Sequence, residues 1–245
     1  MYAGVMKDKS SSSHIFFDKV SHGYGNVSVL KDLSFIVNPG EVIVLVGPSG
    51  CGKTTILNLL SGYINPVAGT IRREGVIRTV YQQDGLFPWL TVSENISLGL
   101  RSVADMHMRS KELEELLDLI HLEEFRSHYP HQLSGGMKQR VELARVLAGD
   151  SDILLMDEPF SALDYQARLY MRREFVRILE TRPRTVVFVT HDIEEAAQLA
   201  DRVLVLSKRP ATICRELAIT APRPRRLTDT AVIEAMKEIL KELGL

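Results

Sequence analysis

The sequence has 245 residues, of which 45% are hydrophobic and 25% charged, and its formal net charge is −1 at pH 7. This balance is typical of a globular protein with a full hydrophobic core, and the near-zero charge argues against a nucleic-acid-binding protein. The longest apolar runs, such as residues 42–46, are too short to span a bilayer. Cys51 and Cys214 are predicted to be free thiols in a reducing compartment. Together with the short apolar runs, this predicts a soluble, cytoplasmic chain that other proteins would have to hold at a membrane.

The first third of the chain is predicted to contain strands and one glycine-rich loop. Residues 1–14, with their serine run, are expected to form a flexible leader, and residues 15–37 to form short strands with apolar alternation. Residues 41–46, EVIVLV, form a continuous apolar stretch that predicts a strand buried on both faces of a sheet. This strand runs into the loop GPSGCGKTT, residues 47–55, and then into a helix that Gly62 is predicted to end.

The middle of the chain is predicted to be mostly helical. Residues 70–81, TIRREGVIRTVY, are expected to form a short hairpin with its turn at residues 74–75. Thr91 is a candidate N-cap for the next helix. Residues 92–146 show no strand pattern, which predicts an all-helical subdomain inserted at about residues 84–150.

Strands and helices alternate again after this insertion. Residues 153–157, ILLMD, and residues 185–191, TVVFVTH, are predicted as buried strands, each followed by an amphipathic helix. RVLVLS, residues 202–207, supplies a further strand. The alternation predicts an α/β fold of the P-loop NTPase type, with a largely parallel sheet and an N-terminal antiparallel β part.

Residues 221–245 are predicted to be a linker and an appended helix. The helix is expected to place Ile233, Met236, Ile239 and Leu240 on one face. The basic linker, with Arg223, Arg225 and Arg226, is expected to be solvated, the alternative being a contact with a partner or a lipid.

The loop after the first buried strand carries the pattern of a phosphate site. GPSGCGKT matches G-x-x-x-x-G-K-[ST] between a strand and a helix. The glycines let successive amides point at one anion, to which the helix N-terminus adds its positive dipole. Lys53 is expected to reach the β- and γ-phosphates of ATP, and the Thr54 hydroxyl to bind Mg²⁺. The predicted nucleotide-binding residues of this loop are Gly47, Pro48, Ser49, Gly50, Cys51, Gly52, Lys53, Thr54 and Thr55.

Two carboxylates follow the strand ILLMD. Asp157, at the end of the strand, is expected to bind Mg²⁺, and Glu158 to orient or deprotonate the water that attacks the γ-phosphate. The alternative is that both carboxylates cap the next helix. His191 ends another predicted parallel strand and should therefore lie on the same edge of the sheet.

Together these motifs resemble those of the nucleotide-binding subunits of ATP-binding cassette (ABC) transporters, with an ATPase domain over residues 15–220. The resemblance implies an Mg-dependent ATPase in which Gln82 and His191 act beside Glu158, and Gln82 also contacts Mg²⁺. It implies that Tyr24 stacks on the adenine. The signature loop of the family is matched by residues 133–136, LSGG, and its D-loop by residues 161–164, SALD. From these two loops the resemblance adds Ser134, Gly135, Gly136 and Asp164 to the nucleotide site.

The family resemblance also implies partners. In this family two cassettes pack head to tail, and each ATP lies between the phosphate loop of one and the signature loop of the other. A second copy of the chain, two transmembrane permease subunits and, indirectly, a solute-binding protein are therefore expected, and no nucleic acid. Leu86, Phe87 and Trp89 are candidates for the permease contact, although Trp89 fits a core position equally well.

Three segments narrow the resemblance to importers of nitrate, sulfonates, taurine and bicarbonate. They are residues 85–100, 136–148 and 209–226. The implied function is uptake of a small anion, powered by ATP at the cytoplasmic face of the membrane. The short segment 70–81 departs from these relatives, in which a longer strand–turn–strand is usual. A soluble assembly ATPase and a lipid- or lipoprotein-extracting ATPase remain as alternatives.

Overall fold

The structure is a computed structural model that describes residues 14–81 and 85–245, so all of the predicted leader except His14, and also Gln82, lie outside the described residues. The described strands are β1 (Ile15–Tyr24), β2 (Val27–Val37), β3 (Val42–Val46), β4 (Ala68–Arg73), β5 (Ile77–Val80), β6 (Ile153–Asp157), β7 (Thr185–Val189), β8 (Arg202–Leu206) and β9 (Ile213–Ala218). The described α-helices are α2 (Lys53–Ser61), α3 (Val92–Ser97), α4 (Met106–Leu119), α5 (Gly135–Leu147), α6 (Tyr165–Thr181), α7 (Ile193–Leu199) and α8 (Thr230–Leu243).

The main sheet has the strand order β5-β6-β7-β3-β8-β9, and only β9 runs antiparallel to its neighbour. Every residue of β3, β6 and β7 is buried, which is typical of parallel strands covered on both faces. A second sheet, in the order β2-β1-β4, is antiparallel. The predicted α/β class, with its N-terminal antiparallel part, is confirmed.

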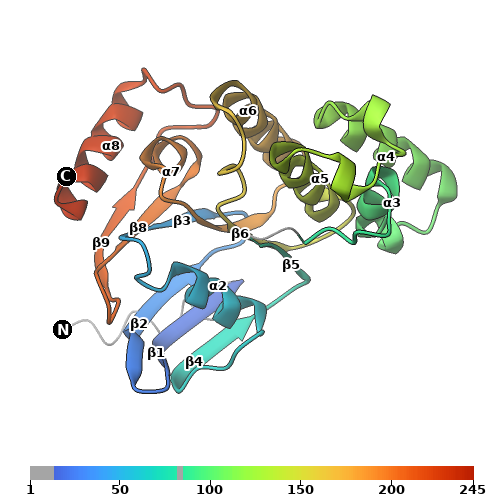
Figure 1. The fold of residues 1–245 in the computed structure, drawn as a ribbon. Helices are drawn as coiled ribbons and strands as arrows, with labels where there is room; N and C mark the ends of the chain where they lie inside the picture. Colours follow the sequence, from blue (N-terminus) through green and yellow to red (C-terminus); the bar gives the residue numbers. More distant parts are fainter. Residues whose placement is uncertain (1–13, 82–84) are drawn as a thin grey trace.

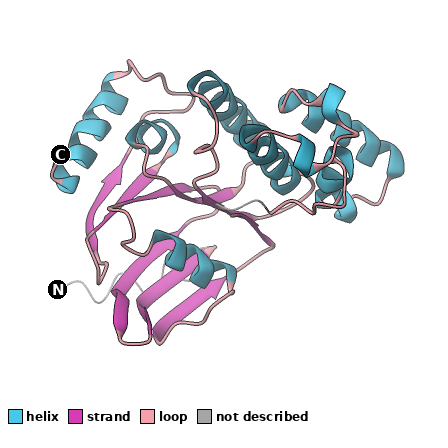
Figure 2. Cartoon of the chain, viewed as in Figure 1, coloured by secondary structure: helices cyan, strands magenta, loops and turns pink. Residues whose placement is uncertain are grey.

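The helices cover the two faces of the main sheet unequally. Figure 1 shows α2 between the two sheets and the longer helices α5, α6 and α8 on the opposite side of the main sheet, a division also visible in Figure 2. The apolar side chains accordingly form two clusters, one around α2 and one between the main sheet and the other helices. The described residues between 92 and 146 contain no strand, as predicted. Thr91 caps α3 and Gly62 ends α2 in a left-handed conformation, which confirms both predictions.

The predicted hairpin over residues 70–81 is wrong. The strand β4 pairs with β1, and β5 pairs in parallel with β6, so the two halves of the segment belong to different sheets. The Asp152 carboxylate accepts a 2.6 Å hydrogen bond from the Val76 amide, and the Val76 carbonyl accepts one of 3.1 Å from the Ile153 amide. Gly75 has a φ of +107°, and a Cβ there would lie 2.6 Å from Asp152. These contacts draw the turn toward β6 instead of folding it back onto β4.

The prediction of a solvated basic linker is wrong for Arg225. This side chain is 7% exposed, and its guanidinium donates to the carbonyls of Ala200, Ile219 and Ala221. The last carbonyls of a helix have no partner within the helix, and Arg225 serves those at the end of α7. Arg226, in contrast, is exposed as expected.

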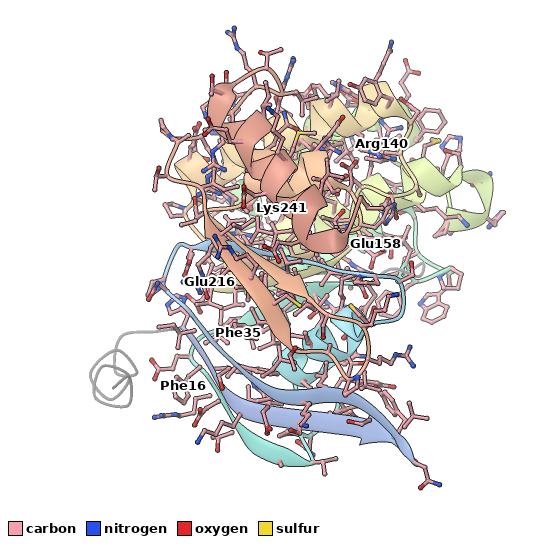
Figure 3. The ribbon with its side chains drawn as sticks, turned by 90° about the vertical axis from the view of Figure 1, so that its left-hand side faces the viewer. Phe16, Phe35, Arg140, Glu158, Glu216 and Lys241 are labelled. Carbon is pink, nitrogen blue, oxygen red and sulfur yellow. The ribbon has the colours of Figure 1, made fainter. Side chains whose placement is uncertain are left out.

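The C-terminal helix packs on the main body by a face shifted from the predicted one. Val232 and Ile239 are fully buried, whereas Ile233 is 39% exposed. Figure 3 shows α8, which carries Lys241, beside the strand that carries Glu216. No helix within the described part of the chain is both long and apolar enough to cross a membrane.

Candidate active site

A pocket of about 300 Å³ lies where β3, β6 and β7 end. This is the edge of a parallel sheet at which ligands usually bind. The lining residues are Tyr24, Val29, Ser49, Gly50, Gly52, Lys53, Thr54, Thr55, Asp157, Glu158, Val189 and Arg209. Two larger hollows, of about 490 and 700 Å³, lie along α6 and contain none of the predicted site residues. The smaller pocket is therefore the candidate active site.

The loop from Gly47 to Gly52 ends in a helix whose first turn is open. Gly52 has a φ of 123°, and no side chain caps α2. The first amides of a helix have no partner within it, so these remain available to an anion. The Lys53 Nζ lies 2.8 Å from the carbonyl oxygen of Gly47 and 3.1 Å from that of Pro48, and donates to both. The side chain of Cys51 is buried in the core, which leaves only its backbone for a ligand.

Asp157 brings a buried carboxylate to the floor of the pocket, where it is 3% exposed. Burial raises the pKa of this carboxyl, and the charge of Glu158 acts in the same direction. A hydrogen bond from Thr54 and the charge of Lys53 lower the pKa in part. A carboxylate whose charge is costly because of its burial is stabilised when a cation binds beside it.

Glu158 has a left-handed backbone conformation, with a φ of +50°, which is unfavourable for a residue that has a side chain. Its backbone is held from several sides. The amide donates to the Val189 carbonyl over 2.9 Å, and the carbonyl accepts from Gln139 Nε2 and Ser161 Oγ, each at 2.9 Å. Such strain persists where neighbouring contacts enforce it, which is common at functional sites. The carboxylate lies 3.0 Å from Nδ1 of His191, whose side chain is 63% exposed.

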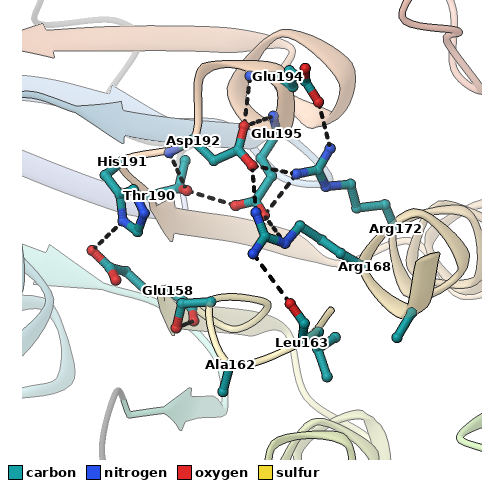
Figure 4. A network of polar contacts seen from close by, with 12 residues as sticks. Glu158, Ala162, Leu163, Arg168, Arg172, Thr190, His191, Asp192, Glu194 and Glu195 are labelled. Carbon is teal, nitrogen blue, oxygen red and sulfur yellow. Dashed lines mark hydrogen bonds and ion pairs between the residues drawn. The ribbon is translucent and has the colours of Figure 1, made fainter. Parts of the chain in front are cut away.

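A buried polar network supports the loop that carries His191, as Figure 4 shows. The guanidinium of Arg172 donates to Asp192 over 2.7 Å and to Glu195 over 2.9 Å, and the Thr190 hydroxyl donates to Glu195 over 2.6 Å. Burial raises the pKa of Glu195, while Thr190 and Arg172 act against that shift. No motif predicted this network, because Arg172 on α6 meets the loop after β7 and the first turn of α7 only in the folded chain.

The signature and D-loop residues stand apart from the pocket. None of Ser134, Gly135, Gly136 and Asp164 lines it. The Ser134 hydroxyl caps α5 by accepting a hydrogen bond from the Met137 amide, and Asp164 caps α6. A Cβ on Gly136 would lie 3.1 Å from the Ala162 carbonyl, so the start of α5 rests directly on the D-loop.

The aromatic segment before α3 divides into a buried and an exposed part. Leu86 is 8% exposed and belongs to the core, so it is wrongly placed among the candidates for a partner contact. Trp89 is 67% exposed and Phe87 is 41% exposed, with their ring centroids 5.4 Å apart. The core alternative for Trp89 is therefore wrong.

Comparison with known proteins agrees with this geometry. The family model described as "ABC transporter" matches residues 30–161. The aliphatic sulfonates import ATP-binding protein SsuB 1 of Rhodococcus jostii (strain RHA1) is 40% identical over 230 residues, covering 91% of each chain. The nitrate import ATP-binding protein NrtC of Synechococcus elongatus is 44% identical over 216 residues, which are 83% of this chain and 33% of that protein.

A solved structure has the same fold. The dimeric bacterial ABC transporter cassette MJ0796 superposes with a TM-score of 0.76 and 32% identity, over 85% of this chain and all of that one. The resemblance expected from the sequence is thus confirmed by family, relatives and fold. The chain belongs to the ABC transporter family, as one of its ATP-binding cassette ATPases.

Proposed function

We propose that this chain is the ATP-hydrolysing subunit of an importer for a small anion. One observation carries the proposal: the chain has a complete phosphate pocket, and a second glycine loop, at Ser134–Gly136, that lies outside this pocket. A nest of amides at a helix start suits an anion, yet the pocket of the same chain does not use it. The arrangement fits a site closed by the second loop of another copy.

Different residues of the pocket bind the phosphates, contact the adenine and act on the attacking water. The open first turn of α2 and the Nζ of Lys53 bind the phosphates, and Tyr24, which is 52% exposed at the rim, stacks on the adenine. Glu158 orients the attacking water or accepts its proton, since its carboxylate borders the pocket. His191, 3.0 Å from this carboxylate, fixes its orientation.

The donor set fits a magnesium ion. The Asp157 carboxylate and the Thr54 hydroxyl both line the pocket, and both are oxygen ligands of the kind that Mg²⁺ prefers. Among the described residues no group of three or more histidine, cysteine, aspartate or glutamate side chains is arranged for a metal. Mg²⁺ needs only one or two protein ligands when phosphates and water complete its shell. The ion would neutralise the phosphates, and Gln82 remains a proposed further ligand.

Two copies acting as a switch connect hydrolysis to transport. ATP bridging the phosphate loop of one copy and the signature loop of its partner closes the dimer, and hydrolysis weakens that bridge. The exposed pair Phe87 and Trp89 is the proposed contact for the transmembrane permease subunits, because aromatic side chains are enriched at the centres of interfaces. The chain would then lie at the cytoplasmic face of the membrane, with a solute-binding protein as an indirect partner.

The substrate class rests on the relatives. The names of two of them refer to the import of aliphatic sulfonates and of nitrate, both of which are anions. We propose an anion of this kind as the cargo. The cargo would pass through the permease subunits and make no contact with this chain.

The test is affinity capture of a tagged Glu158→Gln chain from detergent-solubilised membranes with ATP. Because the variant is expected to bind ATP and hydrolyse it very slowly, a closed dimer with two permease subunits should be recovered. A matched Lys53→Ala/Glu158→Gln variant should recover no dimer. Recovery of soluble partners alone would favour an assembly ATPase, and recovery of a lipid- or lipoprotein-extracting permease would overturn the importer.

A further inference from the structure

The turn between β8 and β9 carries a cation, Arg209, that is not among the nucleotide-binding residues predicted from the sequence. Hydrogen bonds to the neighbouring sheet hold this turn in place. The Lys31 amide donates to the Ala211 carbonyl over 3.1 Å, and the Ala211 amide donates to the Val29 carbonyl over 2.7 Å. The turn is therefore a fixed wall beside the pocket.

Arg209 reaches from this wall onto the phosphate loop. Its Nε donates a hydrogen bond to the Gly50 carbonyl. One of its terminal nitrogens lies 3.0 Å from the point that a Cβ on Gly50 would occupy, and Gly50 has a φ of +71°. The guanidinium also lines the pocket, together with Tyr24 and Lys53.

The position of Arg209 matters because it changes the net charge of the pocket lining. The other charged groups of the lining are Lys53, Asp157 and Glu158, so without Arg209 the lining would carry a net negative charge. ATP and ADP are polyanions, and such a lining would repel them. No ion pair formed within residues 14–81 and 85–245 involves Arg209. A guanidinium also suits phosphate oxygens by its planar donor geometry.

We propose that Arg209 is a second cationic group of the nucleotide site, one that contacts Gly50 on the phosphate loop and attracts the polyphosphate of ATP or ADP. It sets nucleotide affinity and leaves the chemical step to Glu158. This inference rests on the proposed function, because it assigns a further nucleotide-binding residue to the same site.

The test compares three substitutions at this position in the full chain, by calorimetry with Mg-ADP at low salt and by ATP turnover. Arg209→Ala should weaken ADP binding about tenfold and raise KM for ATP similarly, with kcat changed less than about twofold. Arg209→Gln, which can donate to Gly50 without a charge, should behave like Arg209→Ala, and Arg209→Lys should retain most of the affinity. The difference should shrink at about 1 M salt, where charges are screened.

The matched control is Lys208→Ala, which removes the neighbouring exposed cation outside the pocket lining. This variant should bind ADP as the unmodified chain does. Unchanged ADP affinity in Arg209→Ala, or full affinity in Arg209→Gln, would overturn the inference while leaving the proposed function intact. If the unmodified chain bound ADP no better than Lys53→Ala, the proposed function itself would fail.

Discussion

Two glycine-rich loops open helices in this chain, and they differ in what completes the first turn. At the phosphate loop, Gly52 leaves α2 without a side-chain cap, and Lys53 stands in the pocket. At the signature loop, the Ser134 hydroxyl caps α5, and the loop lies outside the pocket. An uncapped helix start offers more free amides to an anion than a capped one. The difference indicates that the first loop binds nucleotide in a single chain, whereas the second contributes when two chains meet.

The largest expected effect is a loss of nucleotide affinity when the phosphate loop is altered. Lys53→Ala removes a cation that also donates to the carbonyls of Gly47 and Pro48, so both phosphate attraction and loop shape suffer. We expect Mg-ADP affinity, measured by calorimetry, to fall about 100-fold, the size of a lost charge-assisted contact. Lys31→Ala removes an exposed cation from β2 and should change nothing. Equal ADP binding by the two variants would remove the phosphate loop from the site.

A smaller effect isolates the second loop. Ser134→Ala removes the cap of α5, at a cost of about 1 kcal/mol in helix stability. The single chain should bind Mg-ADP as before, but ATP-dependent dimerisation in the Glu158→Gln background should weaken about tenfold, measured by light scattering. Ser110→Ala on α4 is the matched control. If Ser134→Ala lost ADP affinity as Lys53→Ala does, the two loops would not have separate roles.

The smallest effect concerns the link between α5, the helix of the signature loop, and Glu158 in the pocket. Gln139 on α5 donates to the Glu158 carbonyl over 2.9 Å and accepts from the Ala162 amide over 2.8 Å. Without it, the strained backbone of Glu158 loses one of its restraints. Gln139→Ala should lower kcat about fivefold, equivalent to roughly 1 kcal/mol, with unchanged ADP affinity. Gln166→Ala, at an exposed position of α6, should retain full turnover, and an equal loss in both would exclude a specific link.

Local patterns were sufficient for the parts of the fold in which neighbours in sequence interact. The buried strands β3, β6 and β7, the cap at Thr91 and the left-handed end at Gly62 follow the prediction. The phosphate loop follows it too, since a strand, a glycine loop and a helix are contiguous. The caps and the phosphate loop depend on contacts between residues a few positions apart. The three strands pair with distant segments, but their burial on both faces is already visible in their continuous apolar runs.

The sequence-based predictions were wrong where a segment pairs with a distant part of the chain. Residues 70–81 contain a plausible hairpin turn, yet Asp152 and the edge of β6 attract the second half more strongly than β4 does. Arg225 looks like a solvated charge in a proline-containing linker, but the open end of α7 supplies buried carbonyls for it. Neither partner is visible in the neighbouring sequence.

The sequence by itself therefore determined the chemistry of this protein, because the groups that hold a phosphate are held by one contiguous strand–loop–helix unit. It also determined the family, through the order of the motifs. Only the tertiary structure decided which groups surround that unit. Arg209 contacts the phosphate loop, Gln139 restrains the backbone of Glu158, and Arg172 binds Asp192 beside His191. Their positions depend on how the sheet edges and helix ends pack together.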